Sequence, residues 1–169
     1  MKRILSVFLA LTMIISLTAC GKSGDRSDTG SAEATNEADV KNMLSEVSEW
    51  LRAEIWYSGF QKVSWSIPES SFYDETIDID VIREQLAKAM EKKADYDTYM
   101  LALPADYSDL VSLYVEASNE IDKQYVFVRD HSKDQIGTYS LLRIRIVLED
   151  FIKACYKIVG TDVPIVILK

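Results

Sequence analysis

A helical repeat of apolar residues between residues 39 and 159 restricts the fold of this chain more than any other feature. Four stretches, 39–58, 79–103, 106–129 and 135–159, each place apolar side chains along one side of a helical wheel. Such a stripe is buried against other helices, and helices joined by short turns pack antiparallel. We therefore expect an all-α fold, an up-down four-helix bundle.

The ends of these helices carry chemical signals. Asp78 or Asp80 can cap the second helix, because aspartate accepts hydrogen bonds from backbone N–H groups at a helix start. Pro104 forbids continuation of that helix, and Gly160 stands where a left-handed residue closes the fourth. The apolar tail 163–168 is predicted to be extended.

One connection is too long and too apolar for an ordinary loop. Residues 59–77 join the first and second helices over nineteen residues, whereas most helix connections are short. The large apolar side chains of this connection are Phe60, Val63, Trp65, Ile67, Phe72 and Tyr73. We expect the connection to fold back over the bundle.

The first nineteen residues have the order of a secretory signal peptide. Lys2 and Arg3 precede an uncharged, mostly apolar run, residues 4–19. This run is too short for a transmembrane helix, which needs about 20 apolar residues. We predict that residues 1–19 are removed during export.

The residues at the end of this run, Leu17-Thr18-Ala19-Cys20, resemble the bacterial lipobox, in which the cysteine receives a diacylglyceryl group. The resemblance implies that Cys20 is lipidated and holds the protein on the outer face of the cell membrane. Residues 21–38 contain no large apolar residue, a composition typical of a flexible linker. We therefore divide the mature chain into a lipidated tether, 20–38, and a helical domain, 39–169.

Three further motifs follow one another along the domain: the tryptophans Trp50 and Trp56, the sequence Asp78-Ile79-Asp80, and the turn Leu103-Pro104-Ala105-Asp106-Tyr107. In this order they resemble a broad set of small Gram-positive helical-bundle lipoproteins of unassigned role. The resemblance implies a fold and a location at the cell envelope, and it implies no activity.

The charge of the mature chain argues against a nucleic-acid partner. Loss of Lys2 and Arg3 leaves 17 of the 19 basic side chains against 27 acidic ones, a formal charge of −10. Phosphate-binding surfaces need clustered Lys and Arg, which this chain lacks. An acidic domain is also repelled by anionic lipid, so the acyl chains on Cys20 must provide the membrane attachment.

Catalytic constellations are not apparent in the sequence. His131 and Cys155 are expected about 30 Å apart along one helix, which excludes a Cys-His dyad. A calcium loop counted from Asp78 would place Ile82 and Arg83 where an oxygen ligand and a glycine belong. We expect no metal, no cofactor and no enzymatic activity.

Two polar residues lie within apolar arcs, Glu54 on the first helix and Lys93 on the second. We expect them to lie roughly 15 Å apart in depth and each to snorkel or pair elsewhere, Lys93 with Glu116 or Glu120. Trp56 points away from the core arc of an α-helix. The residues Tyr139, Leu142 and Ile146 form an outer apolar stripe, which we expect the connection or the tail to cover; the alternative is a protein partner or a second copy of the chain.

The candidate binding residues are Glu54, Trp56, Trp65, Phe72 and Tyr73. Our first hypothesis is a non-catalytic interaction module that binds a protein or another envelope component with the aromatic connection. The alternatives are a small-ligand carrier, with Trp50, Trp65 and Phe72 lining a pocket, and an envelope enzyme that uses Glu54 in a cleft.

Overall fold

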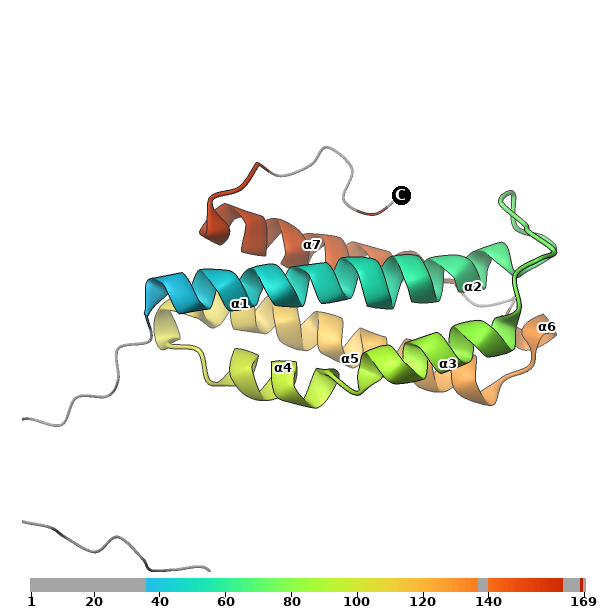
Figure 1. Cartoon of the computed structure of the whole chain (residues 1–169), viewed down its shortest axis with the longest axis horizontal. Helices are drawn as coiled ribbons and strands as arrows, with labels where there is room; N and C mark the ends of the chain where they lie inside the picture. The colour runs from blue at the N-terminus through green and yellow to red at the C-terminus, as the bar shows by residue number, and fades with distance from the viewer. Residues whose placement is uncertain (1–35, 137–139, 163–167, 169) are drawn as a thin grey trace, which may run out of the picture. The chain divides into compact units, whose positions relative to one another are not determined.

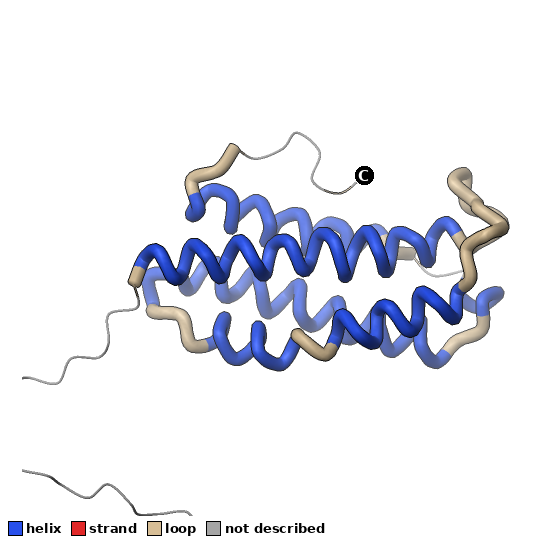
Figure 2. Tube along the Cα trace, viewed as in Figure 1, coloured by secondary structure: helices blue, strands red, loops and turns tan. Residues whose placement is uncertain are grey.

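The computed structural model describes residues 36–136, 140–162 and 168. Every element within these residues is helical, and none of them forms a strand (Figure 2). The prediction of an all-α fold is therefore confirmed. None of the described helices is long and apolar enough to span a membrane. The predicted signal peptide, the lipobox with Cys20, and the tether as far as residue 35 lie outside the described residues.

The first helical segment is longer than predicted. Helices α1 (Glu37–Glu49), η1 (Trp50–Phe60) and α2 (Gln61–Trp65) follow one another without a break (Figure 1). The side chain of Asn36 caps the start by accepting a hydrogen bond from the Ala38 N–H at 3.1 Å. The predicted end at Ser58 is wrong because Gly59, which we took as the start of a loop, is buried inside the helix. Only residues 66–78 form the connection.

The middle section η1 is a π-helix, in which hydrogen bonds join residues five apart. The N–H of Gln61 donates to the carbonyl of Trp56, five residues earlier. Buried side chains recur at the same interval: Trp50 with Leu51, Ile55 with Trp56, and Phe60 with Gln61. The π-helix thus places a five-residue repeat of pairs, apolar except for Gln61, on one buried face.

This geometry corrects the expected direction of Trp56. An α-helical wheel places Trp56 away from the core, but only 5% of its surface is exposed. The correction arises because the wider π-helical turn brings Trp56 to the same side as Leu51, five residues before it, which is fully buried.

The predicted second helix is divided. Helices α3 (Ile79–Met90) and α4 (Lys93–Leu101) are separated by a turn at residues 91–92. The expected cap is confirmed, since the Asp78 carboxylate accepts a hydrogen bond from the Asp80 N–H at 2.9 Å. Helix α4 ends before Pro104, as predicted.

The remaining elements are a short 3-10 turn η2 (Ala105–Tyr107) and the helices α5 (Ser108–Asp130), α6 (Lys133–Ile136) and α7 (Leu142–Val159). The predicted fourth helix, 135–159, therefore begins seven residues too early, because α6 is a separate single turn. Gly160 has a φ of 83° and closes α7 in the left-handed conformation, as predicted. Arg83 joins α3 to the end of α5 by donating to the carbonyls of Val128 and His131.

The helices share one hydrophobic core. Helix α7 packs against α5 and α1, η1 packs against α3, and α4 packs against α5. The core extends from Val40 to Leu168, which is fully buried although it lies in the predicted tail; residues 163–167 lie outside the described residues.

The contact between η1 and α3 leaves no room for a side chain at Gly59. A Cβ atom there would lie 2.3 Å from Leu86 Cδ2 and 3.3 Å from the Glu54 carbonyl oxygen. We expect Gly59→Ala to destabilise the domain by about 1–3 kcal/mol, since overpacking outweighs the gain in helix propensity. Urea unfolding of the single variants and of Gly59→Ala/Leu86→Ala tests this contact. Strictly additive effects, or a Gly59→Ala domain as stable as the wild type, would contradict it.

Candidate functional site

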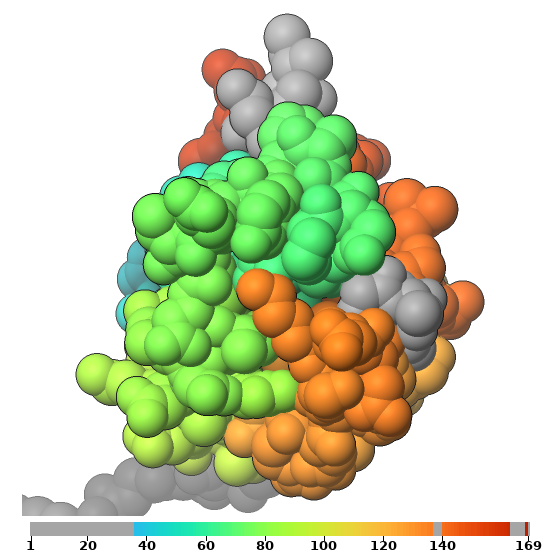
Figure 3. All heavy atoms as spheres, turned by 90° about the vertical axis from the view of Figure 1, so that its right-hand side faces the viewer, coloured from blue at the N-terminus to red at the C-terminus, as the bar shows by residue number. Residues whose placement is uncertain are grey.

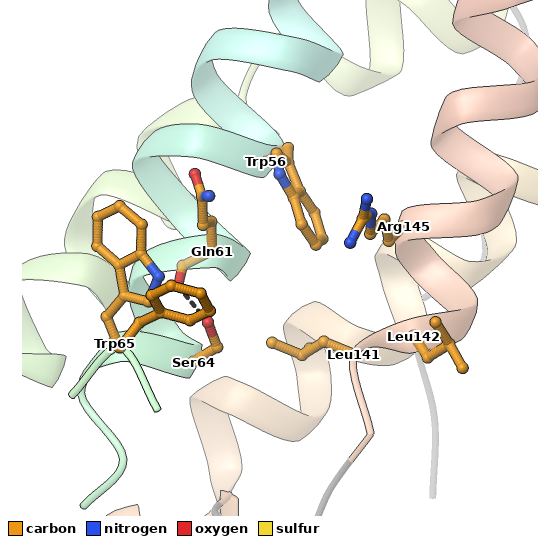
Figure 4. A pocket seen from close by; sticks show the side chains of 8 residues that line it. Trp56, Gln61, Ser64, Trp65, Leu141, Leu142 and Arg145 are labelled. Atoms are coloured by element: carbon orange, nitrogen blue, oxygen red, sulfur yellow. Dashed lines mark hydrogen bonds between the residues drawn. The ribbon is translucent and has the colours of Figure 1, made fainter. Parts of the chain in front are cut away.

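An apolar cavity of about 460 Å³ lies where the first helical segment meets the start of α7. Figure 3 looks onto this end of the domain, where the connection, in green, meets the chain around α6, in orange. Figure 4 shows the cavity from close by. Its lining residues are Trp56, Gln61, Ser64, Trp65, Phe72, Leu141, Leu142 and Arg145. We refer to it as the aromatic cavity.

Three of the five predicted binding residues line this cavity: Trp56, Trp65 and Phe72. Tyr73 lies beside it and lines a second, shallower hollow of about 670 Å³ that shares Trp65 and Phe72 with the first. The aromatic residues of the predicted site therefore come together. Glu54 lines neither hollow.

Each aromatic wall is held by a different part of the fold. The π-helix sets the direction of Trp56, and Trp65 is the last residue of α2. The carbonyl of Trp65 accepts a hydrogen bond from the Asp74 N–H at 2.8 Å, which closes the connection into a loop. Phe72 projects from this loop with 71% of its surface exposed. The predicted folding back of the connection thus applies to Ile67, which is buried, and does not apply to Phe72.

The opposite wall comes from the start of α7 and contains residues that sequence reasoning did not place in a site. Leu141, Leu142 and Arg145 line the cavity from this side. The signal that could have found them is the outer apolar stripe that includes Leu142 and Ile146. Leu142 is 62% exposed and Ile146 is 49% exposed, so the described part of the chain does not cover that stripe. Tyr139 lies outside the described residues.

Two of the residues that line the cavity carry hydrogen-bond donors without a partner in the described residues. The Trp56 Nε1–H is buried and has no acceptor within the described residues. Arg145 Nε donates to Glu149 at a long 3.3 Å, and neither Nη atom of Arg145 has a partner in the described part of the chain. Figure 4 shows the Arg145 guanidinium on the side of the cavity that faces Trp56.

Glu54 forms an ion pair with Lys92 at 2.5 Å, and 41% of its side chain is exposed. The hydrogen bond to Glu54 raises the pKa of Lys92. The expected 15 Å offset between Glu54 and Lys93 is wrong, since Glu54 pairs with Lys92, the residue directly before Lys93. The first helical segment extends to Trp65, so Glu54 lies further from the connection than the prediction assumed.

Lys93 is buried but does not contact Glu116 or Glu120. It pairs with Asp97 at 2.8 Å and with Asp122 at 3.0 Å. Burial lowers the pKa of Lys93, but hydrogen bonds to the two aspartates outweigh burial and raise it. Asp97 also accepts hydrogen bonds from the hydroxyls of Tyr114 and Ser118. The predicted partners point instead toward α7, where both pair with Arg143.

Neither His131, the sole histidine, nor the buried Cys155 lines the cavity. The His131 ring stacks on Phe127, with ring centroids 4.1 Å apart, at the end of α5. Cys155 is fully buried on α7. Trp50, which the carrier hypothesis placed in a pocket, donates its indole N–H to the Ala89 carbonyl at 3.0 Å and packs on Tyr96. That part of the carrier hypothesis is wrong because Trp50 belongs to the core.

No protein-family model matches the chain, and no curated protein or solved structure shows significant similarity to it.

The burial of Cys155 leads to a prediction about its reactivity. Burial raises the pKa of this thiol to about 12, although a hydrogen bond with Ser48 lowers it in part. Since the thiolate is the reactive form, we expect a thiol reagent at pH 8 to label Cys155 only when the domain unfolds. Because the pKa is raised in the folded state, the stability that this group contributes is present below pH 9 and is lost as the pH rises toward 12. Fast labelling under native conditions would contradict this assignment.

Proposed function

We propose that this protein is an extracytoplasmic lipoprotein, anchored to the cell membrane through lipid on Cys20, whose helical domain is a non-catalytic binding module. The order of charged and apolar residues in 1–19 and the lipobox-like Leu17-Thr18-Ala19-Cys20 support the anchor. Two acyl chains suffice for stable attachment.

We further propose that the domain is an up-down four-helix bundle. The four members are the continuous segment α1–η1–α2, the divided pair α3–α4, the long helix α5, and α7. The packing of α7 on α5 and α1, of η1 on α3, and of α4 on α5 supports this grouping.

The observation that carries the binding role is the aromatic cavity. Its volume of about 460 Å³ lies within the range of roughly 300–1,000 Å³ that is typical of small-ligand sites. Five of its eight lining residues are apolar. These properties favour the capture of an apolar group. A protein partner is the second candidate, because Phe72, Tyr73, Leu142 and Ile146 add exposed apolar surface nearby.

The position of the cavity suits a tethered binding protein. The chain enters the domain at Asn36, and α2 ends at the opposite end of the first helical segment (Figure 1). This segment spans 29 residues from Glu37 to Trp65, or about 40 Å. The cavity therefore lies at the end of the domain opposite Asn36, where the predicted tether joins the domain.

The enzyme alternative required Glu54 in a cleft. Glu54 pairs with Lys92 on the surface and lines neither hollow beside the connection. Its position gives no support for that role, and we propose the binding role instead.

The anchor is tested by changing Cys20 to alanine in a bacterial host that processes lipoproteins. We expect the wild type to incorporate a palmitate analogue and to fractionate with membranes, and the Cys20→Ala protein to lose both properties. The matched control is Cys155→Ala, which retains Cys20. Equal labelling of wild type and Cys20→Ala would refute lipidation at this residue.

The cavity is tested with a neutral apolar fluorophore, N-phenyl-1-naphthylamine, and the chain 20–169 carrying Cys20→Ser. We expect saturable binding that brightens the probe, and a loss of about tenfold in affinity for Trp65→Ala, which removes a large apolar wall. Val126→Ala, an exposed apolar residue on α5, is the control and should change nothing. Absence of saturable binding would refute the capture of neutral apolar ligands by this cavity.

A further inference from the structure

We infer that the aromatic cavity selects amphiphilic organic anions, namely molecules with an apolar chain or ring and one carboxylate, and that Arg145 binds the carboxylate. This inference rests on the proposed binding role and adds the chemical class of the ligand. The apolar walls alone do not select for a charged ligand. The preference for an anion depends on the charged and hydrogen-bonding groups at the cavity.

The walls account for the apolar part of the ligand. Trp56 and Trp65 supply two large flat surfaces from one side, and Leu141 and Leu142 supply aliphatic surface from α7 (Figure 4). Aromatic and aliphatic side chains gain free energy when a ligand removes them from water. The exposed ring of Phe72 stands at the same cavity and can cover a bound chain.

Arg145 accounts for the negative charge. Its side chain is 42% exposed, and its Nε donates to Glu149 at a distance longer than a strong charge-assisted bond. Both Nη atoms are left without a partner in the described part of the chain. The two Nη groups of a planar guanidinium can donate two parallel hydrogen bonds to one carboxylate.

The neighbouring acid does not neutralise this site. Glu149 is shared by Arg145 at 3.3 Å and Lys153 at 3.4 Å, so one carboxylate faces two cations. Helix α7 also begins beside the cavity, and its first turn contains no acidic residue, although the Ser140 hydroxyl accepts a hydrogen bond from the Leu142 N–H at 3.3 Å. The positive end of the helix dipole adds to the attraction for an anion.

The second unpaired donor, the Trp56 Nε1–H, is enclosed and adds nothing to this charge. It is fully buried and has no acceptor in the described residues, so a ligand in the cavity meets the Trp56 ring and not its N–H. The donors that the cavity offers to a ligand are thus the Nη groups of Arg145. Their complement is an acceptor, and a carboxylate is the acceptor that also carries charge. The domain as a whole is acidic, so anion binding here requires a local cause.

The test compares decanoate with decanol, which share an apolar chain and differ in charge. Isothermal titration calorimetry uses the chain 20–169 with Cys20→Ser, which retains every described element and carries no acyl chain that could compete. We expect decanoate to bind at least tenfold more tightly than decanol, the scale of a hydrogen bond between charged groups, and to weaken as salt is added.

Arg145→Gln should remove this preference by weakening decanoate about tenfold while leaving decanol unchanged. Arg143→Gln is the matched control, because Arg143 lies on the same helix, pairs with Glu116 and Glu120, and does not line the cavity. It should leave both affinities unchanged. Circular dichroism verifies that each variant is folded.

The outcomes separate the inference from the proposed function. Equal binding of decanoate and decanol, or an Arg145→Gln variant that keeps the preference, overturns the inference while the binding role stands. Binding to vesicles that contain phosphatidylglycerol, with none to monomeric decanoate, also overturns it, since the anion would then be a lipid headgroup. Binding of neither ligand, together with no binding of the neutral fluorophore, overturns the small-ligand role itself.

Discussion

The candidate site depends on the π-helix between Trp50 and Phe60. Hydrogen bonding between residues five apart makes apolar pairs at five-residue intervals face the same side. An α-helix over the same residues would rotate Trp56 away from Leu51. Because π-helices are rare and occur frequently at functional sites, the position of this one beside the aromatic cavity is consistent with a role in shaping it.

Close packing stabilises this uncommon helix. Gly59 lets α3 approach so closely that Leu86 occupies the place of a side chain, and Trp50 donates a hydrogen bond to the Ala89 carbonyl on the same helix. Both contacts join η1 to α3 along one side. The same buried face of η1 also packs against α7, and Trp56 lines the cavity there. The position of this cavity wall thus follows from the packing of η1 between α3 and α7.

Local chemistry made part of this structure predictable. Asp78 and Gly160 act through their own backbone and side-chain atoms, so their roles as caps could be predicted from position alone. The helical periods of α3, α5 and α7 likewise reflect burial on one side. The π-helix was missed because an α-helical period was assumed, although the pairs Trp50-Leu51 and Ile55-Trp56 already repeat at five residues.

Features that depend on register between helices could not be predicted in this way. The partners of Lys93 follow from the turn at residues 91–92, and the depth of Glu54 follows from the length of the first segment. Arg145 was absent from the predicted site because nothing in the sequence around it shows that α7 begins opposite Trp56. The packing of the helices decides which residues line this cavity, and the sequence around each residue does not show it.

Two polar regions of the domain differ in how far their hydrogen bonds are satisfied by the described residues. Buried Lys93 has two carboxylate partners, and Asp97 accepts three hydrogen bonds, so this cluster is satisfied within the domain. The Nη atoms of Arg145 are not satisfied by the described residues, and Arg145 lines an open cavity. A fold that pairs Lys93 so completely can satisfy a buried cation. Donors left unpaired beside an apolar cavity are therefore better explained by an acceptor that comes from outside the chain.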